Sequence, residues 1–291
     1  MSHPLFREGE PVLILDDKQR SRYCVLEAGQ KQGLPGDQMP HDRVIGMPLG
    51  SEIRTRRGRT ARVLPASLAD HIDGMPKHAA IIQPKDIAAI LMHTDIRPGQ
   101  TVVEGGFGSG AMSTALLQAV GSEGRLITYE NRQEAANRGA KNVRTWLGET
   151  PQHTVHIGDI YEGIHEQPID RLVLDVPEPW MVLQTAREAL VYGGSLCAYL
   201  PTILQVHHLV LALGRGRAWC HVRALEVLER SWHVTAQSVR PDHHMVAHTG
   251  FLVFARRGAE VEDEEEATEG GAVEDAEQVD PSTGQQADES A

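Results

Sequence analysis

Hydrophobic and polar positions along the middle of the chain form a regular succession of strand-like and helix-like segments. Short apolar runs predict β-strands at 101–105, 125–130, 153–157, 171–176 and 194–200. The segments between them repeat apolar residues with helical spacing, which predicts helices at 111–120, 132–147, 179–190 and 202–214. Strands that alternate with helices pair in parallel through right-handed crossovers, so the pattern predicts an α/β fold with a doubly wound sheet.

The pattern differs at both ends of this region. Residues 1–70 contain two β-type runs, at 11–15 and 22–27, and recurrent Gly and Pro, which predicts a small β-rich domain. Residues 71–86 are expected to form a connector before a helix at about 86–94. Strand-like runs at 224–239 and 249–256 have no helix between them, so the sheet is expected to end with an antiparallel pair. We therefore assign residues 87–257 to the main domain.

Charge divides the chain at about residue 258. The net charge is −12, but residues 258–291 hold 13 Asp and Glu and no Lys or Arg. The preceding residues are left with 27 acidic groups against 28 Lys and Arg, and a near-neutral body with local basic clusters can bind nucleic acid. Residues 258–291 offer almost nothing to bury, which predicts a disordered acidic tail. We hypothesise that this tail repels non-cognate RNA or raises solubility.

Composition also bears on compartment and cofactor class. The three cysteines, Cys24, Cys197 and Cys220, are widely spaced and form no CxxC pair, which is typical of a reducing compartment. No apolar run approaches the length of a membrane span, and no signal peptide is evident. The 15 histidines show no metal-binding spacing such as HExxH. We expect a cytoplasmic protein that uses neither a membrane nor a metal.

The glycine-rich stretch TVVEGGFGSG, residues 101–110, predicts a nucleoside-binding turn. An apolar strand leads directly into Gly106, Gly108 and Gly110, and a helix follows. Glycine permits the tight turn and leaves the backbone amides open to a ligand. The stretch lacks both the GxGxxG spacing that fits a dinucleotide pyrophosphate and the Lys of a phosphate-binding loop. A phosphate-free nucleoside such as S-adenosylmethionine fits this pattern better.

Acidic residues follow three successive predicted strands. Glu130 ends the second strand, Asp159 follows the third, and Asp175 ends the fourth within LDVPEPW. A single acidic residue after a strand is commonly a solvated cap. Ligands of doubly wound sheets bind at the carboxyl ends of strands, where such groups can accept hydrogen bonds from ribose hydroxyls and an adenine amine. Together with the glycine turn, the three carboxylates predict a ligand site.

Several motifs resemble those of one known family. EGGFGSGA, YENR, GDI, LDVPEPW, GGSLCAYLPTILQV and RPDHHMVAHTGF are similar, in this order, to motifs of the tRNA (adenine-58-N1)-methyltransferase family, TrmI type. The resemblance covers about residues 8–257. It implies a Rossmann-like S-adenosylmethionine-dependent methyltransferase fold with a small N-terminal β-rich domain, and a homotetramer. The implied activity is methylation of N1 of adenosine 58 in the tRNA T-loop.

The resemblance also implies site residues. The cofactor loop would comprise Gly106, Gly108, Ser109, Gly110, Ala111 and Met112, with Glu130 at the ribose and Asp159 at the adenine. Asp175 corresponds to the catalytic aspartate. A carboxylate bonded to the adenine amine can orient the ring and stabilise the positive charge that develops when N1 is methylated. The related N6 enzymes carry an Asn/Asp-Pro-Pro-aromatic motif, which differs from the sequence that follows Asp175.

Candidate substrate contacts come from three further segments. Tyr199 corresponds to a family tyrosine near the substrate pocket, although a strand tyrosine at the sheet edge explains it equally well. Gln83 stands where the family often has Tyr, so an aromatic ring at the active-site border is lost. Arg54, Arg56 and Arg57 belong to the run RTRRGR, which is either a phosphate-contacting patch or a solvated loop.

Two other function classes compete with the methyltransferase hypothesis. One is a non-catalytic tRNA-binding subunit of a methyltransferase complex, which Gln83 and the bulky Phe107 in the glycine turn would explain. The other is methyl transfer to a protein carboxylate, as in isoaspartyl repair enzymes with a similar glycine motif. LDVPEPW and the N-terminal β-rich region favour the tRNA enzyme over the protein-carboxylate alternative, whereas cofactor binding would distinguish it from the non-catalytic subunit.

Overall fold

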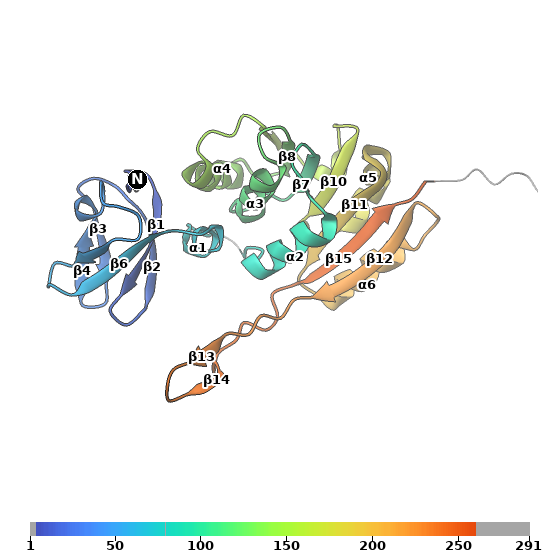
Figure 1. Cartoon of the computed structure of the whole chain (residues 1–291). Helices are drawn as coiled ribbons and strands as arrows, with labels where there is room; N and C mark the ends of the chain where they lie inside the picture. Colours follow the sequence, from blue (N-terminus) through green and yellow to red (C-terminus); the bar gives the residue numbers. More distant parts are fainter. Residues whose placement is uncertain (1–3, 79, 260–291) are drawn as a thin grey trace, which may run out of the picture. The chain divides into compact units, whose positions relative to one another are not determined.

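The N-terminal part of the chain is built from short antiparallel strands. The computed structural model describes residues 4–78 and 80–259, in which β1 (Pro11–Asp16), β2 (Ser21–Val25), β5 (Glu52–Arg54) and β6 (Thr60–Pro65) form a sheet of order β2-β1-β6-β5 (Figure 1). A second pair consists of β3 (Lys31–Leu34) and β4 (Asp37–Pro40), and the 3₁₀-helix η1 (His41–Arg43) follows it. Alternate residues of β1 and β6 point inward and pack with Phe6, Leu26, Met39 and Val44.

Two helices lead from these strands to the main sheet. Helix α1 (Leu68–Gly74) begins at Ser67, whose hydroxyl accepts from the backbone N–H of Asp70 while the Asp70 carboxylate accepts from Ser67 N–H. Helix α2 (Pro84–Thr94) begins with a proline at its first position, where no backbone N–H is needed. Helix α1 crosses the boundary that we predicted at residue 70, because the capping pair at Ser67 starts a helix within the expected loop.

The main domain contains a seven-stranded sheet of order β12-β15-β11-β10-β7-β8-β9. Its parallel strands are β7 (Thr101–Gly105), β8 (Arg125–Glu130), β9 (His153–Ile157), β10 (Ile169–Leu174) and β11 (Leu190–Leu200). Strand β15 (Phe251–Arg257) pairs antiparallel with β11 and with β12 (Trp219–Glu226). The doubly wound α/β sheet and its antiparallel end are therefore confirmed.

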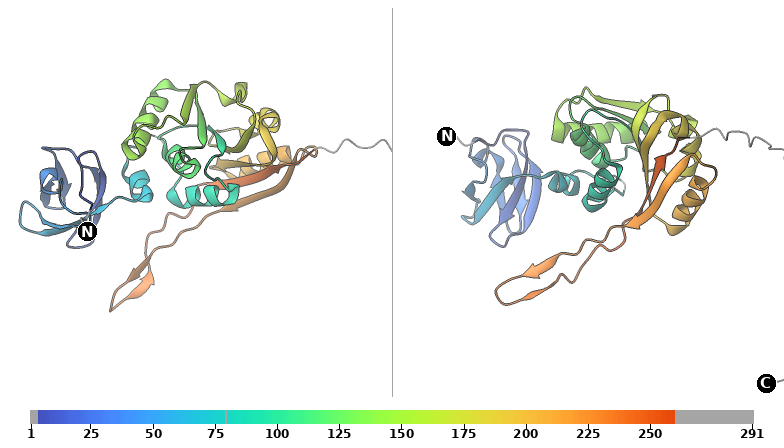
Figure 2. Two further views of the ribbon diagram at one scale, coloured as in Figure 1. Left: turned by 45° about the horizontal axis from the view of Figure 1, so that its top comes forward. Right: turned by 45° about the vertical axis from the view of Figure 1, so that its right-hand side comes forward.

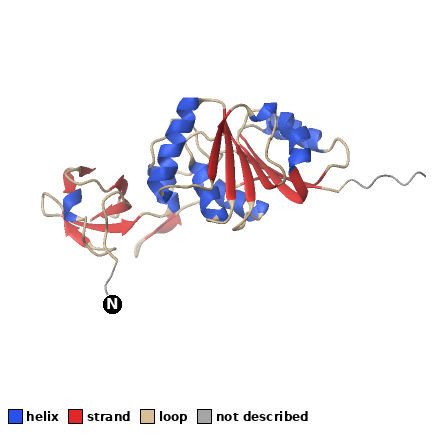
Figure 3. Ribbon diagram, turned by 90° about the horizontal axis from the view of Figure 1, so that it is seen from above, coloured by secondary structure: helices blue, strands red, loops and turns tan. Residues whose placement is uncertain are grey.

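Helices cover both faces of this sheet (Figure 3). Helices α3 (Ala111–Val120) and α4 (Gln133–Leu147) pack with α2 on one face, against Val102, Leu126 and Val173. Helices α5 (Leu183–Ala189) and α6 (Ile203–Leu213) pack on the other face, against Val103 and Leu172. Adjacent strand residues therefore alternate between the two cores, which explains why the strands read as continuous apolar runs.

Some segments differ from the sequence prediction. The expected helix at 179–190 starts as the 3₁₀-helix η3 (Pro179–Val182) before α5, and the short 3₁₀-helix η2 (Ile160–Glu162) follows β9. The expected strand at 224–239 is not continuous, because β12 ends at Glu226, opposite the first residue of β15. Between them the chain forms a long ribbon that carries β13 (Trp232–Val234) and β14 (Val239–Pro241) at its tip (Figure 2). Of the expected acidic tail, residues 260–291 lie outside the described residues.

Candidate functional site

The candidate site lies where the strand order reverses, between β7 and β10. The chain continues from β7 to β8 and β9 on one side, and then returns to place β10 on the other side of β7. Asp175 directly follows β10, and its backbone N–H donates to Gly105 O at 2.8 Å. A Cβ atom at Gly106 would lie 2.3 Å from Asp175 O, so only glycine allows the two strand ends to approach this closely.

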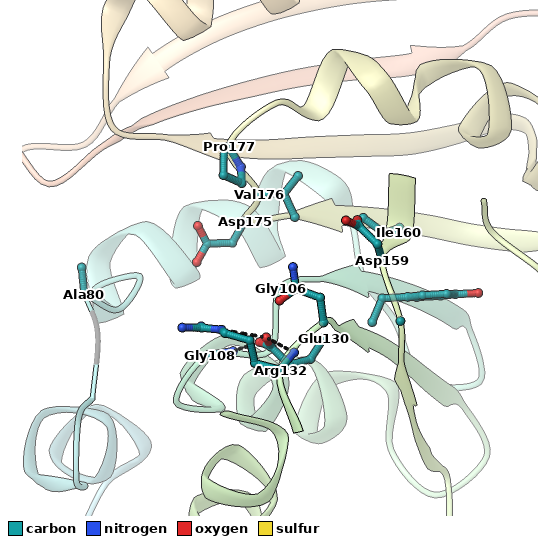
Figure 4. Close-up of a pocket in the computed structure, with 13 residues that line it drawn as sticks. Ala80, Gly106, Gly108, Glu130, Arg132, Asp159, Ile160, Asp175, Val176 and Pro177 are labelled. Atoms are coloured by element: carbon teal, nitrogen blue, oxygen red, sulfur yellow. Dashed lines mark hydrogen bonds and ion pairs between the residues drawn. The ribbon is translucent and has the colours of Figure 1, made fainter. Parts of the chain in front are cut away.

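A cavity of about 360 Å³ opens at this point. Four of the residues predicted from the glycine turn and the strand ends line it together with Asp175, namely Gly106, Gly108, Glu130 and Asp159. Figure 4 shows the carboxylates of Asp175, Asp159 and Glu130 arranged around Gly106. Gly108 has φ +53°, and a Cβ atom there would meet no atom within 4 Å, so the space beside this backbone is open. The cavity therefore has the glycine cradle that a nucleoside requires.

Glu130 holds the glycine turn through its buried carboxylate. One oxygen accepts from Gly108 N–H at 3.1 Å, and the other accepts from the backbone N–H of Arg132 at 3.1 Å and from its Nε at 3.3 Å. The guanidinium of Arg132 is largely exposed, so its ion pair with Glu130 can exchange with solvent. Each carboxylate oxygen has two lone pairs, so Glu130 can still accept hydrogen bonds from a ligand.

Asp159 has a similar arrangement at the end of β9. It caps the 3₁₀-helix η2, and its Oδ1 accepts from Tyr161 N–H at 3.0 Å. No described residue donates to Oδ2, and the side chain is only partly buried against the cavity. The free oxygen is therefore available to an amine or a hydroxyl group of a ligand.

Asp175 carries the carboxylate of the site with the most strongly altered electrostatic environment. Its side chain is open to the cavity, but protein atoms crowd around it, and no described residue donates a hydrogen bond to it. This partial desolvation raises the pKa of Asp175 to about 6. An aspartate without a partner, with its pKa shifted towards neutrality and directed into a cavity, is typical of a functional group.

The remaining residues of the predicted cofactor loop do not line this cavity. Ser109 is buried, and its backbone O accepts from Asn142 Nδ2 at 2.9 Å. Gly110 precedes α3, and Ala111 and Met112 form the buried first turn of that helix. These four residues therefore support the loop from the protein interior and do not line the cavity. Eight other lining residues were not among the predicted site residues, although all except Ala80 lie within the motifs YENR, GDI and LDVPEPW: Ala80, Tyr129, Asn131, Arg132, Gly158, Ile160, Val176 and Pro177.

Phe107 does not obstruct the cavity. Its side chain is buried in the core on the α3 and α4 face, where it packs against Gly139. A Cβ atom at Gly139 would lie 3.0 Å from the Phe107 ring, so the glycine provides the space that the large side chain needs. The large side chain at this position of the glycine turn is thus accommodated within the core.

Gln83 and Tyr199 lie apart from the cavity that contains Asp175. Gln83 is the residue before α2 and lines a second cavity of about 360 Å³ with residues of the ribbon, including Glu229 and His244. Tyr199 is buried, and its hydroxyl donates to Thr249 O at 2.6 Å. Burial raises the pKa of Tyr199 to about 12. The structure thus gives Tyr199 a role in anchoring the start of β15.

The three predicted arginine contacts lie at the β5–β6 turn of the N-terminal part. Arg54 is the last residue of β5, whereas Arg56 and Arg57 fall in the turn, so the three arginines do not lie along one strand. All three side chains are exposed. The neighbouring Arg59 instead pairs with Asp17, with Nε 3.0 Å from Oδ2.

The part of the chain that the structure describes contains neither a candidate metal site nor a candidate membrane-spanning helix. No three His, Cys, Asp or Glu side chains gather closely enough there to hold a metal ion. Among residues 4–78 and 80–259, no helix combines the length and apolar character needed to cross a membrane.

Comparison with known proteins identifies the family. The model of a family described as the tRNA methyltransferase complex GCD14 subunit matches residues 73–240. A tRNA (adenine(57)-N(1)/adenine(58)-N(1))-methyltransferase TrmI of Methanocaldococcus jannaschii is 34% identical over 245 residues, which cover 76% of this chain and 86% of that protein. The tRNA (adenine(58)-N(1))-methyltransferase TrmI of Thermus thermophilus is 34% identical over 249 residues, which cover 85% and 96%.

Two solved structures share the whole architecture. An S-adenosylmethionine-dependent O-methyltransferase from Thermotoga maritima is 32% identical, with a TM-score of 0.84, over 90% of this chain and 100% of that one. The tRNA (m1A58) methyltransferase TrmI from Aquifex aeolicus is 27% identical, with a TM-score of 0.78, over 88% and 100%. The chain therefore belongs to the tRNA (adenine-58-N1)-methyltransferase family, TrmI type, and has the Rossmann-like fold of S-adenosylmethionine-dependent methyltransferases.

Proposed function

We propose that this protein transfers a methyl group from S-adenosylmethionine to N1 of adenosine 58 in the tRNA T-loop. The family and the fold imply S-adenosylmethionine as the methyl donor. The observation that carries the proposal is the meeting of Glu130, Asp159 and Asp175 around one cavity beside the glycine turn. An inactive tRNA-binding subunit would not need all three carboxylates at the same cavity.

We assign the cofactor to the half of the cavity formed by β7, β8 and β9. When bound, the sulfonium group of the cofactor supplies an electrophilic methyl group. Gly106 and Gly108 leave room for the ligand beside the backbone, while Ser109, Gly110, Ala111 and Met112 support the loop. Glu130 accepts from the ribose hydroxyls, and Asp159 uses its free Oδ2 to accept from the adenine amine.

Asp175 acts on the target base. Its carboxylate accepts a hydrogen bond from the exocyclic amine of the target adenine, which turns the lone pair of N1 towards the methyl donor. Methylation of N1 gives the ring a positive charge that is shared with this amine. The carboxylate of Asp175, which nearby protein atoms partly desolvate, stabilises that charge. Asp175 can then accept the amine proton, for which a pKa of about 6 is suitable.

The exposed arginines Arg54, Arg56 and Arg57 are proposed to contact tRNA phosphates, because all three are accessible to an anionic partner. Nη1 of Arg54 also donates to Gly58 O and Thr60 Oγ1, both at 3.2 Å, which orients its guanidinium group. Gln83 lines the second cavity, where it would support RNA that enters along the ribbon. Tyr199 would act indirectly, because its hydroxyl donates to the backbone O of Thr249, which lines the same cavity. The resemblance further supports a homotetramer, and the three widely spaced cysteines support a reducing compartment such as the cytoplasm. Light scattering of the purified protein would measure the oligomer.

The experiment that tests the activity is nucleoside analysis of the product. Unmodified tRNA is incubated with the protein and S-adenosylmethionine, digested and examined by mass spectrometry. The proposal predicts 1-methyladenosine, and it predicts that replacement of adenosine 58 removes the methylation at that position. N6-methyladenosine, or no methylated nucleoside, would contradict it. Because the Methanocaldococcus relative is named for positions 57 and 58, single replacement of each adenosine also shows whether both are substrates.

A second candidate is methyl transfer to oxygen, since the Thermotoga structure is named an O-methyltransferase. The two reactions give distinguishable products. A methyl ester on a protein carboxylate is lost in mild base, whereas a methyl group on adenine N1 stays in the nucleoside fraction. Radiolabelled cofactor offered with tRNA or with protein acceptors would show which acceptor takes the label.

A further inference from the structure

A small cavity lies at the opposite end of the main sheet from Asp175. It has a volume of about 50 Å³ and is enclosed by β11, β12, β15 and the end of α2. Ser195 of β11 lines it in register with Arg171 of β10, which in turn pairs with Val102 near the start of β7. The cavity therefore opens near the amino ends of the parallel strands and plays no part in the proposed methyl transfer.

Ser195, one of the residues that line this cavity, has a buried and unpaired hydroxyl group. Its side chain is only 2% exposed, and its Oγ has no hydrogen-bond partner among the described residues. Buried hydroxyl groups almost always have a partner, because an unpaired one loses its hydrogen bonds to water without replacement. An unpaired hydroxyl on the wall of a cavity points to a ligand that supplies the missing hydrogen bond.

Cationic and donor side chains surround the same space. Arg223 and Arg256 line it with His93 and His221, and the Phe254 ring forms its apolar wall. The guanidinium carbon of Arg223 lies 5.7 Å from the centre of this ring. Arg256 Nε donates to Gly193 O at 2.8 Å, which orients its guanidinium group and leaves the terminal nitrogens without a partner among the described residues.

The backbone of β12 is irregular where it contributes to this cluster. His221 is not a glycine but has φ +52°, and the pairing of β12 with β15 shifts register between Cys220 and Arg223. Such bulges change the direction of side chains and often accompany functional sites. No acidic side chain is among the residues that line the cavity. The carboxylate of Asp95, on which the charge of Arg256 acts, also accepts from Arg97 Nε at 2.8 Å.

We propose that this cavity binds a tetrahedral oxyanion of the phosphate class. Its volume suits one such group and is too small for a nucleotide. Arginine guanidinium groups bind phosphate oxygens through paired N–H donors, and Ser195 and the two histidines add donors from other directions. A carboxylate has only two oxygens and would leave part of this donor set unused. The ligand is either a free phosphate ion or a phosphodiester of bound tRNA.

Calorimetric titration of the full-length protein with inorganic phosphate tests the site. We expect saturable binding of one phosphate per chain, weakened about tenfold or more in Arg223→Gln and several-fold in Ser195→Ala. Arg125→Gln is the matched control, because Arg125 is an exposed arginine at the start of β8 that lies outside the cavity. No saturable binding to the wild-type protein, or equal affinity in all four proteins, would overturn the proposal.

The affinity for tRNA, measured with the same variants, shows whether the ligand is a free phosphate ion or a phosphodiester of tRNA. If the ligand is a tRNA phosphodiester, inorganic phosphate competes with tRNA, and Arg223→Gln weakens the binding of both. If the ligand is free phosphate, Arg223→Gln loses phosphate binding but keeps the wild-type affinity for tRNA.

Thermal unfolding checks that the variants are folded. Phosphate should raise the melting temperature of the wild-type protein and of Arg125→Gln, whereas it should raise that of Ser195→Ala much less. Because no methyl transfer is measured, these results do not depend on the proposed catalytic activity.

Discussion

The buried acid Glu104 offers a quantitative test of the electrostatics beneath the glycine turn. Glu104 is 1% exposed, and its Oε2 accepts from Ser113 Oγ at 2.6 Å and from Thr128 Oγ1 at 2.8 Å. Its Oε1 has no partner among the described residues. Burial raises the pKa of Glu104 to about 8 from an ordinary value of 4.5, so the folded protein holds this side chain protonated at neutral pH. Glu104→Gln keeps the shape and removes the titration.

The raised pKa has a definite sign and size as a contribution to stability. Between the unfolded and the folded pKa, the folded state binds more protons at Glu104 than the unfolded state does, so the free energy of unfolding falls as pH rises. Over the whole range between the unfolded pKa of 4.5 and the folded pKa of about 8, the free energy of unfolding changes by about 5 kcal/mol. From about pH 5 to about pH 8 the expected loss is about 3–4 kcal/mol.

Urea unfolding of wild-type and Glu104→Gln protein at several pH values measures this loss. Other groups titrate in the same range: burial lowers the pKa values of His71 and His153 to about 4, so their contribution makes stability rise with pH below about 6.5. These contributions are common to both proteins and cancel in the difference between them. The wild-type protein should lose stability relative to Glu104→Gln as pH rises. Parallel stability curves over this range would refute the reasoning.

Three further predictions concern Gly106 in the glycine turn, Lys85 in the first turn of α2 and Arg57 in the β5–β6 turn. Gly106→Ala should destabilise the fold by more than about 1 kcal/mol and abolish cofactor binding in calorimetry, because φ is +93° and the new Cβ would lie 2.3 Å from Asp175 O. Lys85→Met should cost about 3–5 kcal/mol in urea unfolding, because Lys85 Nζ is 2.8 Å from the carboxylate of Asp86, which is 0% exposed and would lose its counter-charge; an unchanged midpoint would contradict this. Arg57→Gln should weaken tRNA binding and reduce its dependence on salt by about one unit of logarithmic slope, while cofactor binding stays at the wild-type level; an unchanged slope would remove Arg57 from the interface.

Much of the main domain was predictable because its strands are buried on both faces. Runs such as those ending at Gly105 and Glu130 read as continuous apolar segments, and the helices between them leave only parallel pairing. The site followed from the same logic, since carboxyl ends of neighbouring parallel strands meet at one edge. Glu130, Asp159 and Asp175 are far apart in the sequence, and the strand order alone brings them to one cavity.

Other features depend on contacts that no local pattern encodes. The ribbon between β12 and β15 forms because β15 starts opposite Glu226 and leaves the residues between without a neighbouring strand. Phe107 is tolerated only because Gly139 of α4 leaves space for its ring. Gln83 borders a different cavity because the first turn of α2 packs near the ribbon. Positions of this kind depend on tertiary packing.

The central claim, that Asp175 directs methylation to adenine N1, is tested most directly by single-turnover kinetics of Asp175→Asn and Asp175→Ala. The product is quantified as 1-methyladenosine in tRNA, and binding of the cofactor product S-adenosylhomocysteine is measured in parallel by calorimetry. The account predicts that both variants bind the cofactor product normally but methylate at least about a hundredfold more slowly. It also predicts that wild-type kcat/KM falls about tenfold per pH unit below about pH 6, as Asp175 becomes protonated. Wild-type rates of 1-methyladenosine formation in both variants would contradict the account.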